Sequence, residues 1–219
     1  MSVSGYSLQS YGEMITCEPR MGAFDRALRQ SITPGCRVID LGAGPGLFAL
    51  LACRYGAGSV VAIEPDPSIE VGRQMARDNG FADRITFVRD LSTNWQPDRL
   101  ADVVISDIRG VMPLFEHHVA TIKDVRARLL KPGGVQIPGV DRVFAALIDA
   151  PKTYEGYRKP WLENDYGVDL TAAWRYRMHD WGRSYQPAEA LLSDTQEFVR
   201  LDYNTITDDS HSARMTFHT

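Results

Sequence analysis

The stretch Val38-Ile39-Asp40-Leu41-Gly42-Ala43-Gly44-Pro45-Gly46 joins an apolar run to a glycine-rich loop, and this combination decides the fold. The apolar run predicts a buried β-strand, and the apolar residues from Leu47 onward predict a helix that begins directly after the glycines. Glycine lets the main chain approach a ligand where a Cβ atom would collide. Strand, glycine loop and helix in this order predict a nucleotide-type cofactor site on a Rossmann-like sheet.

The carboxylate of Asp40 indicates which cofactor this is. A pyrophosphate binds at a helix N-terminus and would be repelled by an acid so close to it. S-adenosylmethionine has no phosphate, and a carboxylate attracts its sulfonium and ammonium groups. Leu47 also stands where a dinucleotide fingerprint needs its last glycine. We therefore expect a site for S-adenosylmethionine, whose product is S-adenosylhomocysteine.

A second acid supports this interpretation. The apolar segment 59–63 predicts a strand that ends in Glu64, about twenty residues after the loop, where a carboxylate accepts hydrogen bonds from both ribose hydroxyls. A glycine-rich turn alone fits an ordinary strand-to-helix connection equally well, and the two acids favour the donor site. The candidate donor-binding residues in this part of the chain are Asp40, Gly42, Ala43, Gly44, Gly46, Leu47, Glu64 and Pro65.

Predicted strands and helices alternate through residues 36–150. We expect strands near 36–41, 59–64, 84–88, 101–106 and 134–137, and helices near 46–55, 67–79 and 115–130. This alternation predicts an α/β fold, a Rossmann-like doubly wound and mostly parallel sheet with helices on both faces. The carboxyl ends of parallel strands share one rim, so the residues after the third strand are further candidates for the donor site: Asp90, Leu91 and Ser92.

Beyond residue 150 the alternation stops. Residues 151–190 contain many aromatic residues, prolines and glycines without a clear period. The segments 196–206 and 213–217 alternate in polarity as exposed strands do. We therefore expect an antiparallel β region that is cut short at Thr219.

The composition excludes several classes of function. The chain has 219 residues, of which 44% are hydrophobic, and a formal net charge of −4. No run of lysine and arginine suggests a nucleic-acid partner. A polar N-terminus without a long apolar run predicts neither a signal peptide nor a membrane partner. Three scattered cysteines predict reduced thiols and a cytoplasmic location.

Two acids, Asp107 and Glu116, flank the loop after the strand near 101–106. If the loop doubles back, their carboxylates converge on a cationic or N–H-rich acceptor, and methyl transfer then requires mainly alignment and exclusion of water. Alternatively, Asp107 caps a turn and Glu116 begins a helix, where acids are favoured. His117 and His118 lack the i,i+4 spacing of a helical metal pair, so we expect them on a solvated helix face and predict no metal site.

The order of these motifs resembles that of protein arginine methyltransferases, and more broadly of bacterial class I methyltransferases of that type. The resemblance covers roughly residues 6–219 and is strongest over 36–138. It implies that Ser10-Tyr11, Glu13-Met14 and Arg20 form a helical cap, in which Arg20 grips the donor's carboxylate and Met14 lies beside the donor. It also implies that Asp107 and Glu116 are the catalytic acids of the family's two-glutamate loop, with Asp107 touching the donor as well. Residues 131–138 match the exit into the family's β-barrel domain.

The resemblance implies three domains and a reaction. The domains are an N-terminal helical cap (1–35), a donor-binding domain (36–150) and the beginning of a barrel-like substrate or dimerisation domain (151–219). The reaction is transfer of a methyl group to a side-chain nitrogen of a protein or peptide arginine, and a homodimer is expected if the missing barrel region is present.

The departures from the family's pattern concern the acceptor. Asp107 stands where the family has glutamate, and Ile108-Arg109-Gly110-Val111 replaces Trp-Met-Gly-Tyr. Arg109 adds a positive charge that competes with a guanidinium acceptor. Two alternatives therefore remain open, namely a small-molecule N- or O-methyltransferase with the same donor site and a non-catalytic domain that binds the donor.

Overall fold

The computed structural model describes residues 6–110, 112–114, 117–180, 182 and 184–219. The chain divides into two compact units, Met1–Asp141 with Leu201–Ser210 and Arg142–Arg200 with His211–Thr219. The three-domain division expected from the sequence stays a prediction. No helix in the described part of the chain is both long and apolar enough to cross a membrane.

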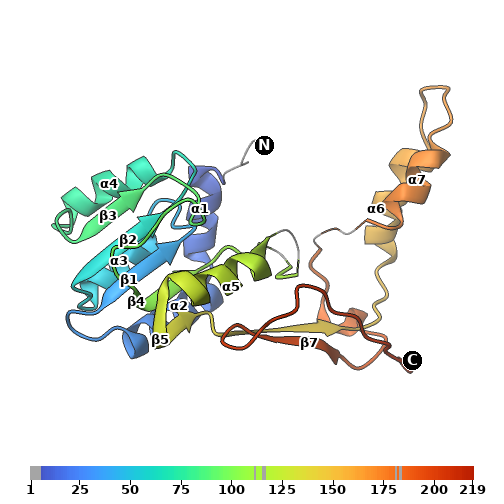
Figure 1. The fold of residues 1–219 in the computed structure, drawn as a ribbon. Helices are drawn as coiled ribbons and strands as arrows, with labels where there is room; N and C mark the ends of the chain where they lie inside the picture. Colours follow the sequence, from blue (N-terminus) through green and yellow to red (C-terminus); the bar gives the residue numbers. More distant parts are fainter. Residues whose placement is uncertain (1–5, 111, 115–116, 181, 183) are drawn as a thin grey trace. The chain divides into compact units, whose positions relative to one another are not determined.

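The first unit is built on a five-stranded parallel sheet with the order β3-β2-β1-β4-β5 (Figure 1). Its strands are β1 (Arg37–Leu41), β2 (Ser59–Ile63), β3 (Ile85–Val88), β4 (Ala101–Ser106) and β5 (Leu130–Ile137). This confirms the predicted doubly wound α/β fold. The strand order reverses between β1 and β4, and open sheets bind their ligands outside the carboxyl ends of the strands at such a point.

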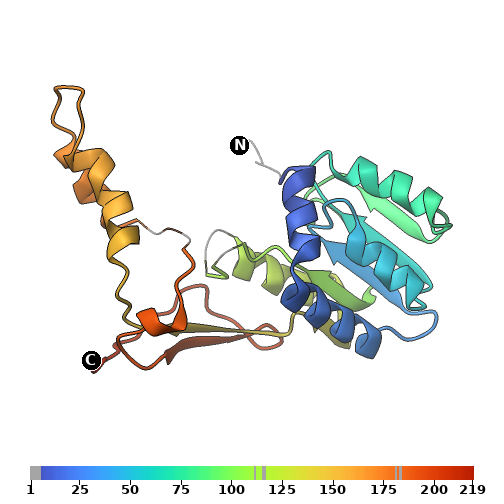
Figure 2. The same cartoon turned by 180° about the vertical axis from the view of Figure 1, so that it is seen from behind.

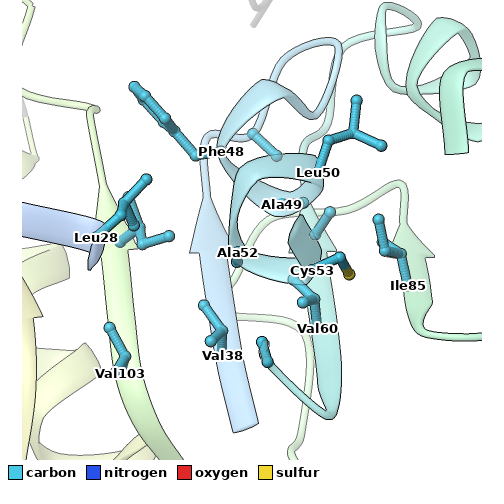
Figure 3. Packing of buried hydrophobic residues seen from close by; sticks show 14 of the residues in the cluster. Leu28, Val38, Phe48, Ala49, Leu50, Ala52, Cys53, Val60, Ile85 and Val103 are labelled. Carbon is cyan, nitrogen blue, oxygen red and sulfur yellow. The ribbon is translucent and has the colours of Figure 1, made fainter. Parts of the chain in front are cut away.

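Helices cover both faces of this sheet because successive residues of a strand point to opposite sides. Val38 of β1 packs in a cluster with α2 (Glu18–Ser31), α3 (Leu47–Arg54) and α4 (Ile69–Asp78), part of which Figure 3 shows. Its neighbour Ile39 packs on the opposite face with Val125 and Leu129, at α5 (His118–Arg128). Figure 2 shows the N-terminal helices, α1 (Leu8–Thr16) and α2, in blue over the sheet.

Strand β5 begins earlier than the sequence predicts. The pattern Lys131-Pro132-Gly133-Gly134 reads as a helix stop followed by a strand from residue 134, yet β5 starts at Leu130. Pro132 is tolerated because β5 is an edge strand of the sheet, so its missing N–H removes no ladder hydrogen bond from a central strand. The register between β4 and β5 shifts between Ala101 and Val103, next to this segment.

The second part of the chain contains a pair of strands and a pair of helices. Strands β6 (Val140–Ala145) and β7 (Gln196–Asp202) form a small antiparallel sheet. Helices α6 (Pro151–Leu162) and α7 (Thr171–Arg177) are joined by an edge-on contact between Tyr154 and Trp174, and the short helix η1 (Ala188–Ala190) follows. The two helices were not predicted. The expected strand at 213–217 was wrong, since these residues have no strand structure.

Candidate functional site

The glycine loop after β1 has the backbone that its sequence predicts. Gly42, Gly44 and Gly46 have φ angles of +62°, +52° and +82°, a region that glycine enters without strain, and α3 begins at the next residue. A Cβ atom on Gly44 would lie 2.5 Å from the ring of Tyr11, which belongs to α1. The loop is therefore closely covered by a side chain of the N-terminal helix.

Asp40, the last residue but one of β1, is almost fully buried, and only one of its two carboxylate oxygens has a hydrogen-bond partner among the described residues. Its Oδ2 atom accepts a hydrogen bond of 2.9 Å from the backbone N–H of Ala49, whereas Oδ1 is buried without a partner among the described residues. Burial raises the pKa of Asp40 to about 8, and the nearby acids Glu64 and Asp107 act in the same direction. This carboxyl group is therefore mostly protonated at neutral pH, and an approaching cation favours its ionised form.

Glu64, directly after β2, is buried at the same rim. One carboxylate oxygen accepts from the N–H of Gly44 and the other from the N–H of Asp66, each at 2.9 Å. Burial raises the pKa of Glu64, and these two backbone hydrogen bonds partly offset the rise. A carboxylate oxygen has two lone pairs, so each oxygen can accept one more hydrogen bond. The pairing of Leu41 with Ile63 in the sheet brings the residues after β1 and β2 together.

Arg20 and Asp107 are joined in the structure. Arg20 donates from Nε (3.1 Å) and Nη2 to the Oδ2 atom of Asp107, and from Nη1 to the carbonyl of Met14. Its guanidinium also lies against the rings of Phe24 and Phe48, each 5.4 Å from the ring centre. Leu41 pairs with Ser106, so Asp107 stands beside the glycine loop at the switch point of the sheet.

The remaining candidates lie around this rim. Ala43 is buried, and Leu47 and Pro65 are half-buried. After β3, Asp90 accepts from the N–H of Leu91 and from Asn94, and the carbonyl of Ser92 accepts from Arg128. Asp90 and Leu91 are exposed, so this turn leaves polar groups open to a ligand. Glu116 lies outside the described residues.

A chain of polar groups that the sequence did not indicate lies next to Asp107. Arg109 donates to Asp141 over 2.5 Å, Tyr203 donates to the other oxygen of Asp141 over 2.6 Å, and His118 lies 2.9 Å from the Tyr203 hydroxyl. The expected solvated position of His118 was therefore wrong: it is 4% exposed, packed edge-on against Tyr203. His117 is exposed, as expected. In the sequence, the one sign of this site is His118, a polar residue near the start of a predicted amphipathic helix. That pattern does not show whether the side chain points to the core or to solvent.

Comparisons with known proteins identify the family of this chain. The family model described as ribosomal protein L11 methyltransferase (PrmA) matches residues 24–138. The arginine N(omega)-methyltransferase of Streptomyces achromogenes subsp. streptozoticus is 32% identical over 142 residues, which cover 63% of this chain and 39% of that protein. A probable protein arginine N-methyltransferase 6 of Arabidopsis thaliana is 29% identical over 162 residues, covering 73% of this chain and 37% of the relative. This chain thus spans less than half the length of either relative.

Solved structures show the same fold. The Trypanosoma brucei PRMT1 enzyme–prozyme heterotetrameric complex with AdoHcy aligns with a TM-score of 0.80 and 23% identity, covering 90% of this chain and 63% of that chain. Residues 24–138 are just over half of the 219 residues of this chain. The chain therefore belongs to the methyltransferase family of the ribosomal protein L11 methyltransferase (PrmA) model, and its resemblance to protein arginine methyltransferases is confirmed.

Proposed function

We propose that this chain binds S-adenosylmethionine and transfers its methyl group to a side-chain nitrogen of arginine in a protein or peptide. The observation that carries the proposal is the rim where β1, β2 and β4 end. It gathers the glycine loop, a buried Asp40 oxygen without a partner in the described structure, and the carboxylate of Glu64. This set fits a cationic donor that carries a ribose.

Each part of the donor has a complementary group on this rim. Glu64 has a free lone pair on each oxygen for the two ribose hydroxyls. Asp40 offers its unpaired oxygen to positive charge, and Arg20 offers a guanidinium to the donor's carboxylate. Met14, Asp107 and the turn Asp90-Leu91-Ser92 complete the proposed contacts, with the backbone at Gly42, Ala43, Gly44, Gly46, Leu47 and Pro65 lying close to the donor. S-adenosylmethionine supplies a methyl group already activated by its sulfonium.

On the acceptor side, this chain provides orientation and charge. Asp107 and Glu116 are proposed to hold the acceptor guanidinium and to aim one nitrogen at the methyl group. The proposal draws support from the position of Asp107 at the switch point of the sheet and from the 32% identical arginine N(omega)-methyltransferase. A small-molecule acceptor and a non-catalytic donor-binding role are the alternative outcomes.

A methylation assay with labelled donor decides between these outcomes. The chain is offered arginine-containing peptides and a panel of small amines, alcohols and acids. Transfer to peptide arginine supports the proposal. Transfer to small molecules alone would contradict arginine as the acceptor. Donor binding without any methyl transfer would contradict an enzymatic role. Glu116→Gln should lower turnover more than about tenfold at nearly unchanged donor affinity, with the exposed Glu70→Gln as the matched control.

Arg20 provides a separate test of the donor site. Arg20→Lys keeps the charge but loses the fork that pairs with a carboxylate, so binding of both S-adenosylmethionine and S-adenosylhomocysteine should weaken. Arg26→Lys, an exposed arginine on the same helix, is the matched control. Equal affinities of the two variants, measured by isothermal titration calorimetry, would remove Arg20 from the donor site.

We also propose that the protein forms a homodimer and is located in the cytoplasm. Helices α6 and α7 and the segment between them support dimer formation, because large side chains there are unusually exposed, with Tyr166 of the connecting segment at 84% and Tyr176 of α7 at 82%. Light scattering after gel filtration should give the mass of a dimer, and the double variant Tyr166→Ser with Tyr176→Ser should give that of a monomer.

The proposed cytoplasmic location is supported by the free cysteines at positions 17, 36 and 53. Cell fractionation tests it.

A further inference from the structure

Asp107 has one carboxylate oxygen that is ready to accept a hydrogen bond. Both hydrogen bonds from Arg20 go to Oδ2. The Oδ1 atom accepts no hydrogen bond from the described residues, and the Nε atom of Arg109 lies 3.7 Å from it. At this distance Arg109 and Asp107 form an ion pair but no hydrogen bond, since the nitrogen and oxygen of an N–H···O bond lie about 2.7–3.2 Å apart. A shift of Arg109 by less than about 1 Å would therefore close the bond.

Asp141 holds Arg109 back from that shift. The Nη1 atom of Arg109 lies 2.5 Å from Oδ1 of Asp141, a charge-assisted hydrogen bond that is much shorter than the approach to Asp107. The Asp141 side chain is only 16% exposed, so solvent screens this pair weakly. Asp141 and Asp107 thus compete for one guanidinium, and Asp141 has the better geometry.

Two buried side chains fix the orientation of Asp141. The Tyr203 hydroxyl donates to Oδ2 of Asp141 over 2.6 Å, so its oxygen must accept the hydrogen bond it shares with Nε2 of His118. His118 therefore carries its proton on Nε2. Burial lowers the pKa of His118 to about 4, and Arg109 acts in the same direction against the raising effect of Asp141 and Asp107. The imidazole is neutral at physiological pH.

The backbone around Tyr203 is held as firmly as its side chain. Tyr203 is fully buried, and its N–H donates to the carbonyl of Gly139, two residues before Asp141. Arg126 of α5 donates to the carbonyls of Tyr203 and Ile206. These contacts hold the Tyr203 hydroxyl in place, and the hydrogen bonds that it shares with His118 and Asp141 form a chain whose members polarise one another.

We propose that Asp141, oriented by Tyr203 and His118, is a positioning residue of the acceptor site: it retains Arg109 so that Oδ1 of Asp107 stays available to an acceptor N–H. The inference rests on the proposed arginine acceptor. It explains how a site with an additional arginine can still receive a guanidinium, because that arginine is already bound elsewhere.

The decisive variant is Asp141→Asn, which keeps the shape and removes the charge. A crystal structure should show Nε of Arg109 within about 2.9 Å of Oδ1 of Asp107. The KM for an arginine peptide should rise about tenfold while the Kd for S-adenosylhomocysteine changes less than about twofold. The matched control is Asp209→Asn, which breaks the exposed Lys123–Asp209 pair and should leave both values within about twofold.

The double variant separates positioning from folding. With Arg109→Met added to Asp141→Asn, the competing cation is gone, so KM should return to within about threefold of the wild type. A general structural defect would not be rescued in this way. The inference is overturned if Arg109 remains hydrogen-bonded to residue 141 in the Asp141→Asn crystal structure, or if the rise in KM persists in the double variant.

A third variant covers the case in which Asp141→Asn does not fold. Arg109→Met alone should change KM by less than about threefold, because Arg109 is already kept from Asp107. A tenfold fall in KM would mean that Arg109 competes despite Asp141, and would overturn the inference. If the wild type methylates no arginine peptide, the proposed function fails, whereas the position of Arg109 in the Asp141→Asn crystal still decides the competition between the two acids.

Discussion

The buried carboxyl group of Asp40 should make the stability of the donor-free protein depend on pH, and Asp40→Asn should remove that dependence. The asparagine is isosteric, can accept the hydrogen bond from Ala49 and carries no charge at any pH. In the wild type, the pKa of Asp40 is raised from 3.8 to about 8, chiefly by burial. The folded protein therefore keeps the proton that the unfolded chain releases.

The sign and size of the effect follow from this difference. Below pH 3.8 both states are protonated, and Asp40 contributes no pH dependence. As the pH rises toward 8, the unfolded state is ionised while the folded state is not, so stability falls by about 1.4 kcal/mol per pH unit. Between pH 6 and pH 8 the wild type should lose about 2 kcal/mol relative to Asp40→Asn. In a chain of this size, that corresponds to about 4–8 °C in Tm.

The assay is thermal unfolding of both proteins without ligand at pH 6, 7 and 8, followed by circular dichroism. The Tm difference between wild type and Asp40→Asn isolates Asp40, because every other group titrates alike in both. The exposed Asp78→Asn on α4 is the matched control and should track the wild type. A Tm difference that is the same at pH 6 and pH 8 would show that Asp40 is ionised in the folded protein, and would refute the reasoning.

Three further outcomes are expected. Glu64→Ala should weaken donor binding in calorimetry, because the two lost ribose hydrogen bonds contribute roughly 1.5–3 kcal/mol each before water compensates; a loss below about threefold would contradict the ribose role. Gly44→Val should abolish donor binding and lower Tm, because it places a side chain at a φ of +52° and against the ring of Tyr11. The control Gly80→Val has a φ of +72° with open space around it, so it should lower Tm without affecting donor binding. Normal donor binding by folded Gly44→Val would mean that the loop does not contact the donor. When the pH falls from 7 to 5, the free energy of unfolding measured in urea should decrease by about 2 kcal/mol less in His118→Gln than in the wild type. The reason is that folding lowers the pKa of His118 from 6.5 to about 4, so the unfolded chain takes up a proton that the folded protein does not. Equal decreases in the two proteins would mean that His118 is exposed to water.

The sheet and the donor rim could be predicted because their signals are local. Val38–Leu41 is an apolar run next to glycines whose positive φ angles no other residue adopts easily, and Glu64 ends the next strand. Parallel pairing then brings the strand ends together without further information. The start of β5 could not be predicted, because Pro132 is acceptable only at a sheet edge, and edges are set by the whole topology.

The acceptor side depends on contacts between residues far apart in the chain. Nothing near His118 in the sequence shows that Tyr203 covers it, and nothing near Arg109 indicates Asp141. Asp40 could be found, but its raised pKa depends on burial that only the folded structure shows. The α6–α7 pair was missed because its helices bury little, which leaves no apolar period to detect.

The return of the chain at Leu201–Ser210 to the unit that it left at Asp141 has a consequence for biosynthesis. About 60 residues separate these two points, and ribosomes add about 5–20 residues per second, so the first unit waits roughly 3–12 s for its last segment. During this interval His118 and Arg126 lack the partners that Tyr203 and Ile206 later provide. The nascent protein therefore exposes the surface that later buries Leu201, Tyr203 and Ile206, and this surface is where a chaperone should bind a ribosome-stalled chain ending before residue 200.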